Sequence, residues 1–220
     1  MIKNNLQTLL NQLKNGNNLG EEITLVGATK TQSIEDINLA INYGLQYVAE
    51  NKVQEFREKH GKLSPCHEHF IGHLQTNKVK YLIGNVELIH SVDRLELAKE
   101  ISKQSQNKKV ITNVLLQINI GDEQTKGGFE FENFIDIYNE IKQYPHLRVK
   151  GLMAMLPNIQ NEKELANMCL QMRQLYDIIK KTNDDICYLS VGMTNDYLIA
   201  IKNGSNMIRV GSGIFGNRNY

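Results

Sequence analysis

The sequence predicts an α/β protein with a single (β/α)8 barrel, the TIM-barrel fold, preceded by one extra helix. Three observations support this prediction. The chain has 220 residues, 41% of them hydrophobic, which is enough for one large core. Short runs rich in β-branched residues alternate with longer runs of helical periodicity. Eight such strand–helix units fit into about 200 residues, which favours a closed barrel over an open doubly wound sheet.

The first 18 residues are expected to form a helix that packs on the barrel. Their apolar residues follow helical spacing, at Ile2, Leu6, Leu9, Leu10 and Leu13. The Asn-Gly-Asn-Asn run at 15–18 predicts that this helix stops there. The apolar residues are too scattered for a signal peptide or a membrane span. Since no linker-like stretch follows, we expect residues 1–220 to form one domain.

The predicted barrel strands are short, and each is followed by a helical stretch. They are expected at residues 23–30, 46–51, 67–72, 87–92, 110–120, 148–155, 186–192 and 206–211. Ser33 and Gly44 are expected to cap the helix after the first strand, and Asp93 to cap the helix after the fourth. The active sites of such barrels lie where the strands end and the following loops begin. Residues at these strand ends are therefore the candidates for a functional site.

The ends of the last two predicted strands carry residues that suit a phosphate group. The seventh ends in Ser190-Val191-Gly192-Met193-Thr194 and the eighth in Gly211-Ser212-Gly213. Barrels often bind phosphate with the loops after strands seven and eight, where hydroxyl groups and close backbone approach are useful. Either segment alone is more typical of a tight turn. The two together, on neighbouring strands, favour a phosphate site.

Arg209 lies within the last apolar run, Met-Ile-Arg-Val at 207–210. A buried guanidinium needs a partner, because an unpaired buried charge is costly. The partner is either a structural carboxylate or a ligand that lies over the mouth of the barrel. The residue alone does not decide between these alternatives.

Lys30 ends the first predicted strand, in the stretch ITLVGATKTQ at 23–32. A lysine at a strand end is usually a solvated surface residue. A lysine that is partly desolvated and near other cations loses its proton more readily, and the neutral amine forms a Schiff base with an aldehyde. An amine, a phosphate site and an arginine able to donate to a ring nitrogen are the parts of a pyridoxal 5′-phosphate (PLP) pocket.

Two further lysines, Lys78 and Lys126, could be brought to the same mouth by their loops. Solvated loop residues are the default interpretation of both. We also hypothesise that Lys126, in the segment DEQTKGG, helps to capture or release the cofactor by competing for its aldehyde. An unchanged rate of cofactor exchange in Lys126→Ala would refute this hypothesis.

Several segments together carry a family resemblance: ATK, AENKVQE, HFIGHLQTNK, QINIGDEQTKGG, GLMAM and the run from LSVGMT to IFGNRNY. From about residue 23 to the C-terminus, the sequence resembles the YggS/PROSC family of pyridoxal phosphate homeostasis proteins. The resemblance implies a barrel like the N-terminal domain of alanine racemase. It also implies Lys30 as the Schiff-base lysine, Arg209 at the pyridine nitrogen and Asn51 near the ring. The implied cofactor-binding residues are Lys30, Asn51, Ser190, Gly192, Met193, Thr194, Arg209, Gly211 and Ser212.

The sequence departs from the family pattern at three places. ATK stands where VSK is common, AEN where GEN is common, and His73 where a proline is often found. None of these departures removes a functional group that the pocket needs.

The resemblance favours a carrier over a catalyst. An arginine donor holds the pyridine nitrogen unprotonated, so the ring is a weaker electron sink. Racemisation also needs a second acid or base opposite the lysine. In alanine racemases a tyrosine from a C-terminal domain and the partner subunit supplies it, whereas this sequence ends at Tyr220 directly after the eighth unit. We therefore expect binding of PLP and delivery to PLP-dependent apoenzymes, with little or no turnover.

Three alternatives remain at this stage. The first is a racemase, or another PLP enzyme, that acts as a lone barrel. The second is a Schiff-base aldolase, because a barrel lysine and a phosphate site also suit sugar phosphates. The third is a metal hydrolase, suggested by His67, His69 and His73, although no carboxylates at metal-ligand spacing accompany them.

Composition limits the partners. A formal net charge of +1 and the absence of Trp give no reason to expect nucleic acid or a membrane surface. Cys66, Cys169 and Cys187 show neither disulfide-framework nor metal-ligand spacing, so we expect reduced thiols in a cytoplasmic protein. We also expect a monomer, because no exposed apolar stretch requires a partner chain.

Overall fold

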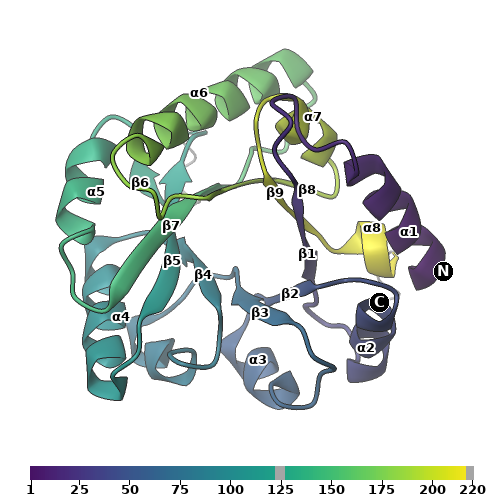
Figure 1. Cartoon of the computed structure of the whole chain (residues 1–220), viewed down its shortest axis with the longest axis horizontal. Coiled ribbons are helices and arrows are strands. Elements are labelled where there is room, and N and C mark those ends of the chain that lie inside the picture. Colours follow the sequence, from purple (N-terminus) through teal and green to yellow (C-terminus); the bar gives the residue numbers. More distant parts are fainter. Residues whose placement is uncertain (122–126, 217–220) are drawn as a thin grey trace.

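Eight parallel strands close into a barrel in the computed structural model of the chain, which describes residues 1–121 and 127–216 (Figure 1). The barrel strands are β1 (Thr24–Ala28), β2 (Tyr47–Glu50), β3 (His67–Phe70), β4 (Leu88–Val92), β5 (Thr112–Asn119), β7 (Leu147–Ala154), β8 (Tyr188–Met193) and β9 (Met207–Val210). Each strand pairs with the next one along the chain, and β9 pairs with β1 to close the ring. The predicted (β/α)8 barrel is confirmed.

Helices surround the barrel on its outside (Figure 1). They are α1 (Ile2–Leu13), α2 (Ile34–Asn42), α3 (Val53–Lys59), the 3₁₀ helix η1 (Thr76–Tyr81), α4 (Leu95–Lys108), α5 (Phe134–Ile141), α6 (Glu162–Lys180), α7 (Tyr197–Lys202) and α8 (Ser212–Phe215). Two elements had no counterpart in the sequence prediction: helix α8 and the two-residue strand β6 (Phe129–Glu130), which pairs with β5. Both are too short to give a periodic pattern.

The predicted helix caps can be compared with the observed ones. Ser33 caps α2 as predicted, because its side chain accepts a hydrogen bond from the Asp36 backbone N–H. Gly44 directly follows Tyr43, the C-terminal cap of α2. The prediction for Asp93 is wrong: α4 begins at Leu95, with Arg94 at the cap position. The Asp93 carboxylate instead pairs with Arg94.

Apolar side chains fill two layers. Inside the barrel, the cluster comprises Val26, Ala49, Leu88, Leu115, Met153 and Met207. Between the barrel and its helices lie two larger clusters, as expected when alternate strand residues face opposite sides. Helix α1 joins the outer layer, because Leu6 and Leu9 pack in the same cluster as Ile214 and Phe215 of α8. The helix predicted over residues 1–18 ends at Leu13.

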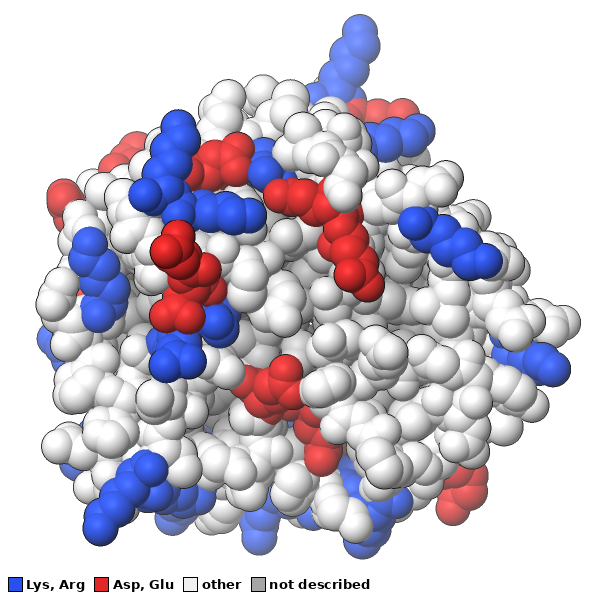
Figure 2. Space-filling model, in the orientation of Figure 1, with Lys and Arg blue, Asp and Glu red and all other residues white. Residues whose placement is uncertain are grey.

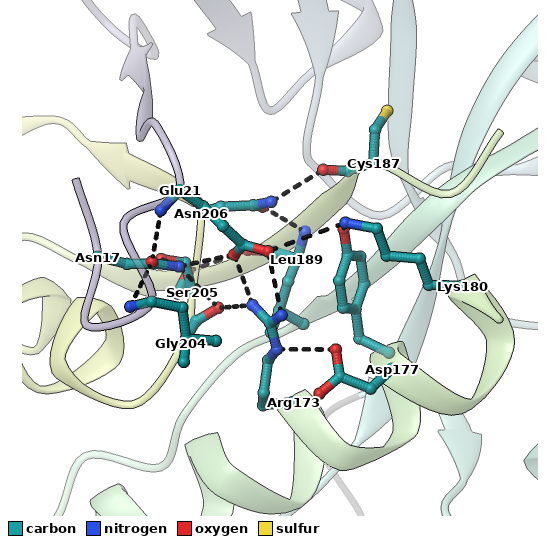
Figure 3. A network of polar contacts seen from close by, with 12 residues as sticks. Asn17, Glu21, Arg173, Asp177, Lys180, Cys187, Leu189, Gly204, Ser205 and Asn206 are labelled. Carbon is teal, nitrogen blue, oxygen red and sulfur yellow. Dashed lines mark hydrogen bonds and ion pairs between the residues drawn. The ribbon is translucent and has the colours of Figure 1, made fainter. Parts of the chain in front are cut away.

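The amino-terminal ends of several strands are joined by a polar network (Figure 3). Arg173 of α6 donates to both carboxylate oxygens of Glu21, and through Nε to Asp177 at 2.9 Å. Asn17 donates to Glu21 at 2.8 Å and to the Gly204 carbonyl at 3.3 Å. The network therefore ties α6 to the segments that lead into β1 and β9.

Surface features add little about partners. On the face seen in Figure 2, basic and acidic side chains are interspersed, and no patch of one sign covers it. None of the helices within residues 1–121 and 127–216 is long and apolar enough to cross a membrane. Cys66, Cys169 and Cys187 are free, as predicted.

Candidate functional site

A cavity of about 500 Å³ opens at the carboxyl ends of the barrel strands. Its lining comes from the ends of strands far apart in sequence: Ala28, Lys30, Gln32, Asn51, Ile71, Met155, Met193, Thr194, Arg209, Gly211, Ser212 and Gly216. Seven of the nine predicted site residues are in this list. The other two, Ser190 and Gly192, lie in β8 and do not line the cavity.

Lys30 lies at the rim because the chain turns directly after β1. The next residue, Thr31, has a φ of 66° and donates its N–H to the Glu55 carboxylate at 2.7 Å. On the other side, the Thr29 hydroxyl donates to Glu50 Oε1 at 2.6 Å. Both neighbours of Lys30 are thus held, while the lysine side chain is exposed at the cavity.

A buried ion pair lies behind this turn, on the outer side of the barrel wall. Lys59 Nζ is 2.7 Å from Glu50 Oε1 and donates to the Thr29 carbonyl at 2.8 Å. Burial raises the pKa of the Glu50 carboxyl, and this effect outweighs the hydrogen bonds from Lys59 and Thr29. Sequence reasoning missed the pairing of Lys59 with Glu50, because the only signal of Lys59 was its position four residues after Glu55 in a helical stretch.

Arg209 points from β9 into the interior of the barrel, near the carboxyl ends of the strands. It donates to the Ser190 carbonyl and the Ser190 hydroxyl, both at 2.7 Å, and to the Ala154 carbonyl at 2.8 Å. Burial lowers the pKa of Arg209 to about 10, although the charge of Asp196 acts in the opposite direction. These three bonds do not use every N–H of a guanidinium. Because Arg209 also lines the cavity, the remaining donors are available to a ligand.

The end of β8 bends toward the cavity. The pairing of β8 with β9 shifts register between Ser190 and Met193, as at a β-bulge, which re-aims the residues that follow. Gly192 lies at this shift with a φ of 105°, and a Cβ there would be 2.9 Å from that of Ala200 in α7. Gly192 therefore permits close packing on α7, and Met193 and Thr194 reach the cavity.

Small polar groups face each other on the β8–β9 side of the cavity. The Gly211 N–H donates to Thr194 Oγ1 at 3.4 Å, so the two predicted phosphate segments are in contact. Ser212 follows and also lines the cavity. A phosphate group here would meet hydroxyl groups and backbone with small side chains, which is the chemistry that an anion requires.

Asn51 lies on the opposite, β2 side of the cavity. Its side-chain oxygen is buried and has no hydrogen-bond partner among the described residues. Gly72 packs against its backbone so closely that a Cβ would be 1.8 Å from the Asn51 carbonyl oxygen. An unpartnered buried polar atom is uncommon and is satisfied when a ligand supplies the partner.

A second cavity of about 290 Å³ adjoins the first and shares Asn51. Lys78 and His73 line this second cavity rather than the first. Arg57 lies here with its guanidinium 4.5 Å from the Tyr81 ring centre. Lys78 is therefore not beside Lys30 in the same cavity, and Lys126 lies outside the described residues.

The histidines that suggested a metal site do not converge. His67 pairs with Glu87, and His73 lies 3.1 Å from Asp93. His69 is buried inside the barrel with its Nδ1 3.0 Å from His90 Nε2. Within residues 1–121 and 127–216, no group of three or more His, Cys, Asp or Glu is placed to hold a metal ion.

The residues of the first cavity fit PLP. An exposed amine, a guanidinium with donors to spare and a cradle of hydroxyl groups line one space, as the three functional parts of PLP require. The unpartnered oxygen of Asn51 adds a polar atom that awaits a ligand.

The family comparison agrees with this geometry. The family model described as alanine racemase, N-terminal domain, matches residues 2–219. The chain belongs to this family. It is 41% identical over 199 residues to the pyridoxal phosphate homeostasis protein of Aquifex aeolicus, covering 89% of this chain and 87% of the relative. The protein of the same name from Escherichia coli K12 is 35% identical over 205 residues, covering 91% and 88%. These relatives confirm the resemblance to the YggS/PROSC family.

Solved structures show the same barrel. PipY of Synechococcus elongatus, solved without PLP, has a TM-score of 0.89 and 25% identity, covering 98% of this chain and all of PipY. An alanine racemase of Clostridium difficile has a TM-score of 0.80 at 18% identity. This chain covers 57% of that racemase, so the likeness concerns the barrel fold alone.

Proposed function

We propose that this protein holds PLP as a Schiff base on Lys30 and takes part in PLP homeostasis, with little or no catalytic turnover. The observation that carries the proposal is that Lys30, Arg209 and Thr194 line one cavity at the carboxyl ends of the strands. The names of the relatives support it, and PipY was also solved with PLP bound.

Each part of the cavity has a role in this proposal. PLP supplies an aldehyde, and Lys30 supplies the amine that bonds to it. Arg209 donates to the ring nitrogen and keeps it free of a proton, since a guanidinium can only donate. Met193, Thr194, Gly211 and Ser212 surround the phosphate, and Asn51 lies near the ring.

The two predicted residues that do not line the cavity act indirectly in this proposal. Ser190 accepts from Arg209 at 2.7 Å and so helps to orient it. Gly192 lets β8 pack against α7 and carry Met193 to the cavity. Direct contact of either residue with the cofactor stays a prediction.

The composition of the lining supports a carrier. Among its described residues there is no Tyr, His, Cys, Asp or Glu to serve as the second acid or base that racemisation needs opposite Lys30. The further parts of the proposal are delivery of PLP to PLP-dependent apoenzymes, a monomeric state and a cytoplasmic location.

The decisive experiment is the absorption spectrum of purified protein, with wild type, Lys30→Ala and Lys78→Ala compared after incubation with PLP. We expect a visible Schiff-base band in wild type and Lys78→Ala, and none in Lys30→Ala. Lys78 is the matched control because it lines only the neighbouring cavity. A band that survived in Lys30→Ala would refute the proposal.

The same samples separate the alternatives. A Schiff-base aldolase would be colourless and would be trapped by borohydride only in the presence of a sugar phosphate. A lone-barrel racemase would convert an amino acid steadily when loaded with PLP. We expect neither result.

A further inference from the structure

A chain of buried polar side chains crosses the inside of the barrel below the cavity. It starts at Arg209 in β9, passes to Ser190 in β8, then to His90 in β4 and ends at His69 in β3. Ser190 Oγ is 3.3 Å from His90 Nδ1, and His90 Nε2 is 3.0 Å from His69 Nδ1. All four residues are buried, with at most 4% of the surface of any one exposed. The contacts join strands far apart in sequence, so no local sequence pattern indicates them.

The hydrogen-bond directions along this series of side chains can be assigned starting from Arg209. A guanidinium only donates, so the Ser190 hydroxyl oxygen accepts from it. The Ser190 O–H is then free to donate to His90 Nδ1. A neutral His90 that accepts at Nδ1 carries its proton on Nε2, which donates to His69 Nδ1. Arg209, Ser190 and His90 thus each donate to the next residue, and His69 accepts at the end of the series.

In two alternatives His90 donates from Nδ1 to Ser190. The other neutral tautomer of His90 would leave the Ser190 hydroxyl proton without an acceptor among the described residues. A cationic His90 is disfavoured by its surroundings. Burial, the neighbouring His69 and the charge of Arg209 together lower the pKa of His90 well below its ordinary value. Burial likewise lowers the pKa of His69 to about 3. Both rings are therefore neutral at physiological pH, and they add no positive charge to the inside of the barrel.

We propose that His90 and His69 are positioning residues for Arg209: through Ser190 they fix the guanidinium so that its remaining donors face the cavity. This inference rests on the proposed function, because the ligand that meets those donors is the PLP ring. Without His90, the Ser190 hydroxyl proton would lose its acceptor and the hydroxyl could turn away from Arg209, which would then be held by the Ser190 and Ala154 carbonyls alone. The donor that faces the ring nitrogen would then be less well placed.

The first test uses cofactor-free protein, so it does not depend on PLP binding. We expect ¹⁵N NMR of the histidine side chains to show His90 neutral, with its proton on Nε2, at neutral pH. We also expect the Arg209 side-chain signals to shift in His90→Leu. A proton on Nδ1 of His90, a cationic His90 or unmoved Arg209 signals would overturn the inference.

The second test is a double-mutant cycle on PLP binding with His90→Leu, Ser190→Ala and the two combined. The loss of a single hydrogen bond predicts a PLP dissociation constant about three- to ten-fold higher in His90→Leu, with a shifted absorption band. In the Ser190→Ala background, His90→Leu should have no further effect, because the link to Arg209 is already broken. Additive effects would overturn the inference.

Two more variants separate positioning from packing. Leu115→Val makes a small cavity in the same interior cluster without touching the chain, and it should leave the band and the affinity unchanged. His90→Asn keeps an acceptor near the position of Nδ1 and should restore part of the affinity lost in His90→Leu. Equal effects of Leu115→Val and His90→Leu would overturn the inference. If wild type bound no PLP, the proposed function would fail, whereas the NMR result would still decide whether the chain holds Arg209.

Discussion

The two ends of the barrel contain similar charged residues but use them differently. At the amino-terminal end, Arg173 and Glu21 pair with each other, and the network of Figure 3 satisfies their remaining groups with Asp177 and backbone carbonyls. At the carboxyl end, the side chain of Lys30 has no hydrogen bond or ion pair within the described residues. The first arrangement stabilises the fold, and the second leaves groups available to a ligand.

Cavity volume does not show which end of the barrel binds a ligand. A larger cavity, about 790 Å³, lies at the amino-terminal end between α1, the segment before β1 and the start of β2. Its polar lining includes Glu22, Gln46 and Tyr47 but brings no amine together with an arginine and a hydroxyl cradle. The smaller cavity at the carboxyl end does so, and the chemistry of the lining therefore identifies the site where volume does not.

The comparison predicts that Arg173→Met destabilises the protein without changing PLP affinity. The substitution leaves Glu21 and Asp177 without their shared partner in a region where the Arg173 side chain is only 13% exposed. We expect the free energy of unfolding to fall by about 2 to 3 kcal/mol. Urea denaturation followed by circular dichroism measures this change, and PLP titration of the folded variant measures affinity.

Arg148→Met is the matched control for this prediction. Arg148 also lies at the amino-terminal end of a strand and pairs with Asp185, but its side chain is 44% exposed. Its loss should cost well under 1 kcal/mol, as is usual for surface ion pairs. A similar loss of stability in both arginine variants, or a weaker PLP affinity in Arg173→Met, would contradict the distinction between the two ends.

Glu21 lies near the amino-terminal end of the barrel and Glu50 near the carboxyl end. Their contributions to the free energy of unfolding should change in opposite directions with pH. Burial acts to raise the pKa of Glu21, but hydrogen bonds and charge from Arg173 outweigh it, so this pKa is lowered. Its stabilising contribution is present above the ordinary value of 4.5 and is lost as pH falls through the lowered value. The pKa of Glu50 is raised by burial, so its contribution is present at low pH and is lost as pH rises through the raised value.

Glu21→Gln and Glu50→Gln test these signs by urea denaturation at a series of pH values. As pH falls, the stability advantage of wild type over Glu21→Gln should shrink. Over the same range, wild type should gain stability relative to Glu50→Gln, since protonation relieves the buried charge. Curves that moved in the same direction for both variants would show that the two carboxyl groups do not differ as their surroundings imply.

The barrel itself was predictable because its signals are local. Alternating short apolar runs and helical stretches gave the strand order, and Ser33 gave a cap through a contact with a residue three positions away. Asp93 does not cap α4, because the Arg94 guanidinium donates a hydrogen bond to the Asp93 carboxylate and Arg94 occupies the cap position. A helix boundary of this kind is fixed by competing side-chain contacts that no periodic pattern records.

The site was predictable as a set of strand ends, but its connections were not. The barrel topology places Lys30, Thr194 and Arg209 at one rim, and the structure puts them in one cavity. Sequence reasoning could not tell that Ser190 lies below the cavity, because a register shift in β8 decides which residues face inward. The buried pair of Lys59 with Glu50 joins residues whose facing sides appear only once α3 is packed on the barrel.

The smallest change in stability is expected for a substitution at the carboxyl end of the barrel. Lys30→Ala removes an exposed side chain without a partner in the described part of the chain, so it should change the free energy of unfolding by no more than about 0.5 kcal/mol. Denaturation of cofactor-free Lys30→Ala beside cofactor-free wild type measures this. With excess PLP, wild type alone should gain stability, because a ligand that binds the folded state shifts the unfolding equilibrium. A large loss of stability without PLP would instead make Lys30 a structural residue, and its end of the barrel would resemble the Arg173 end.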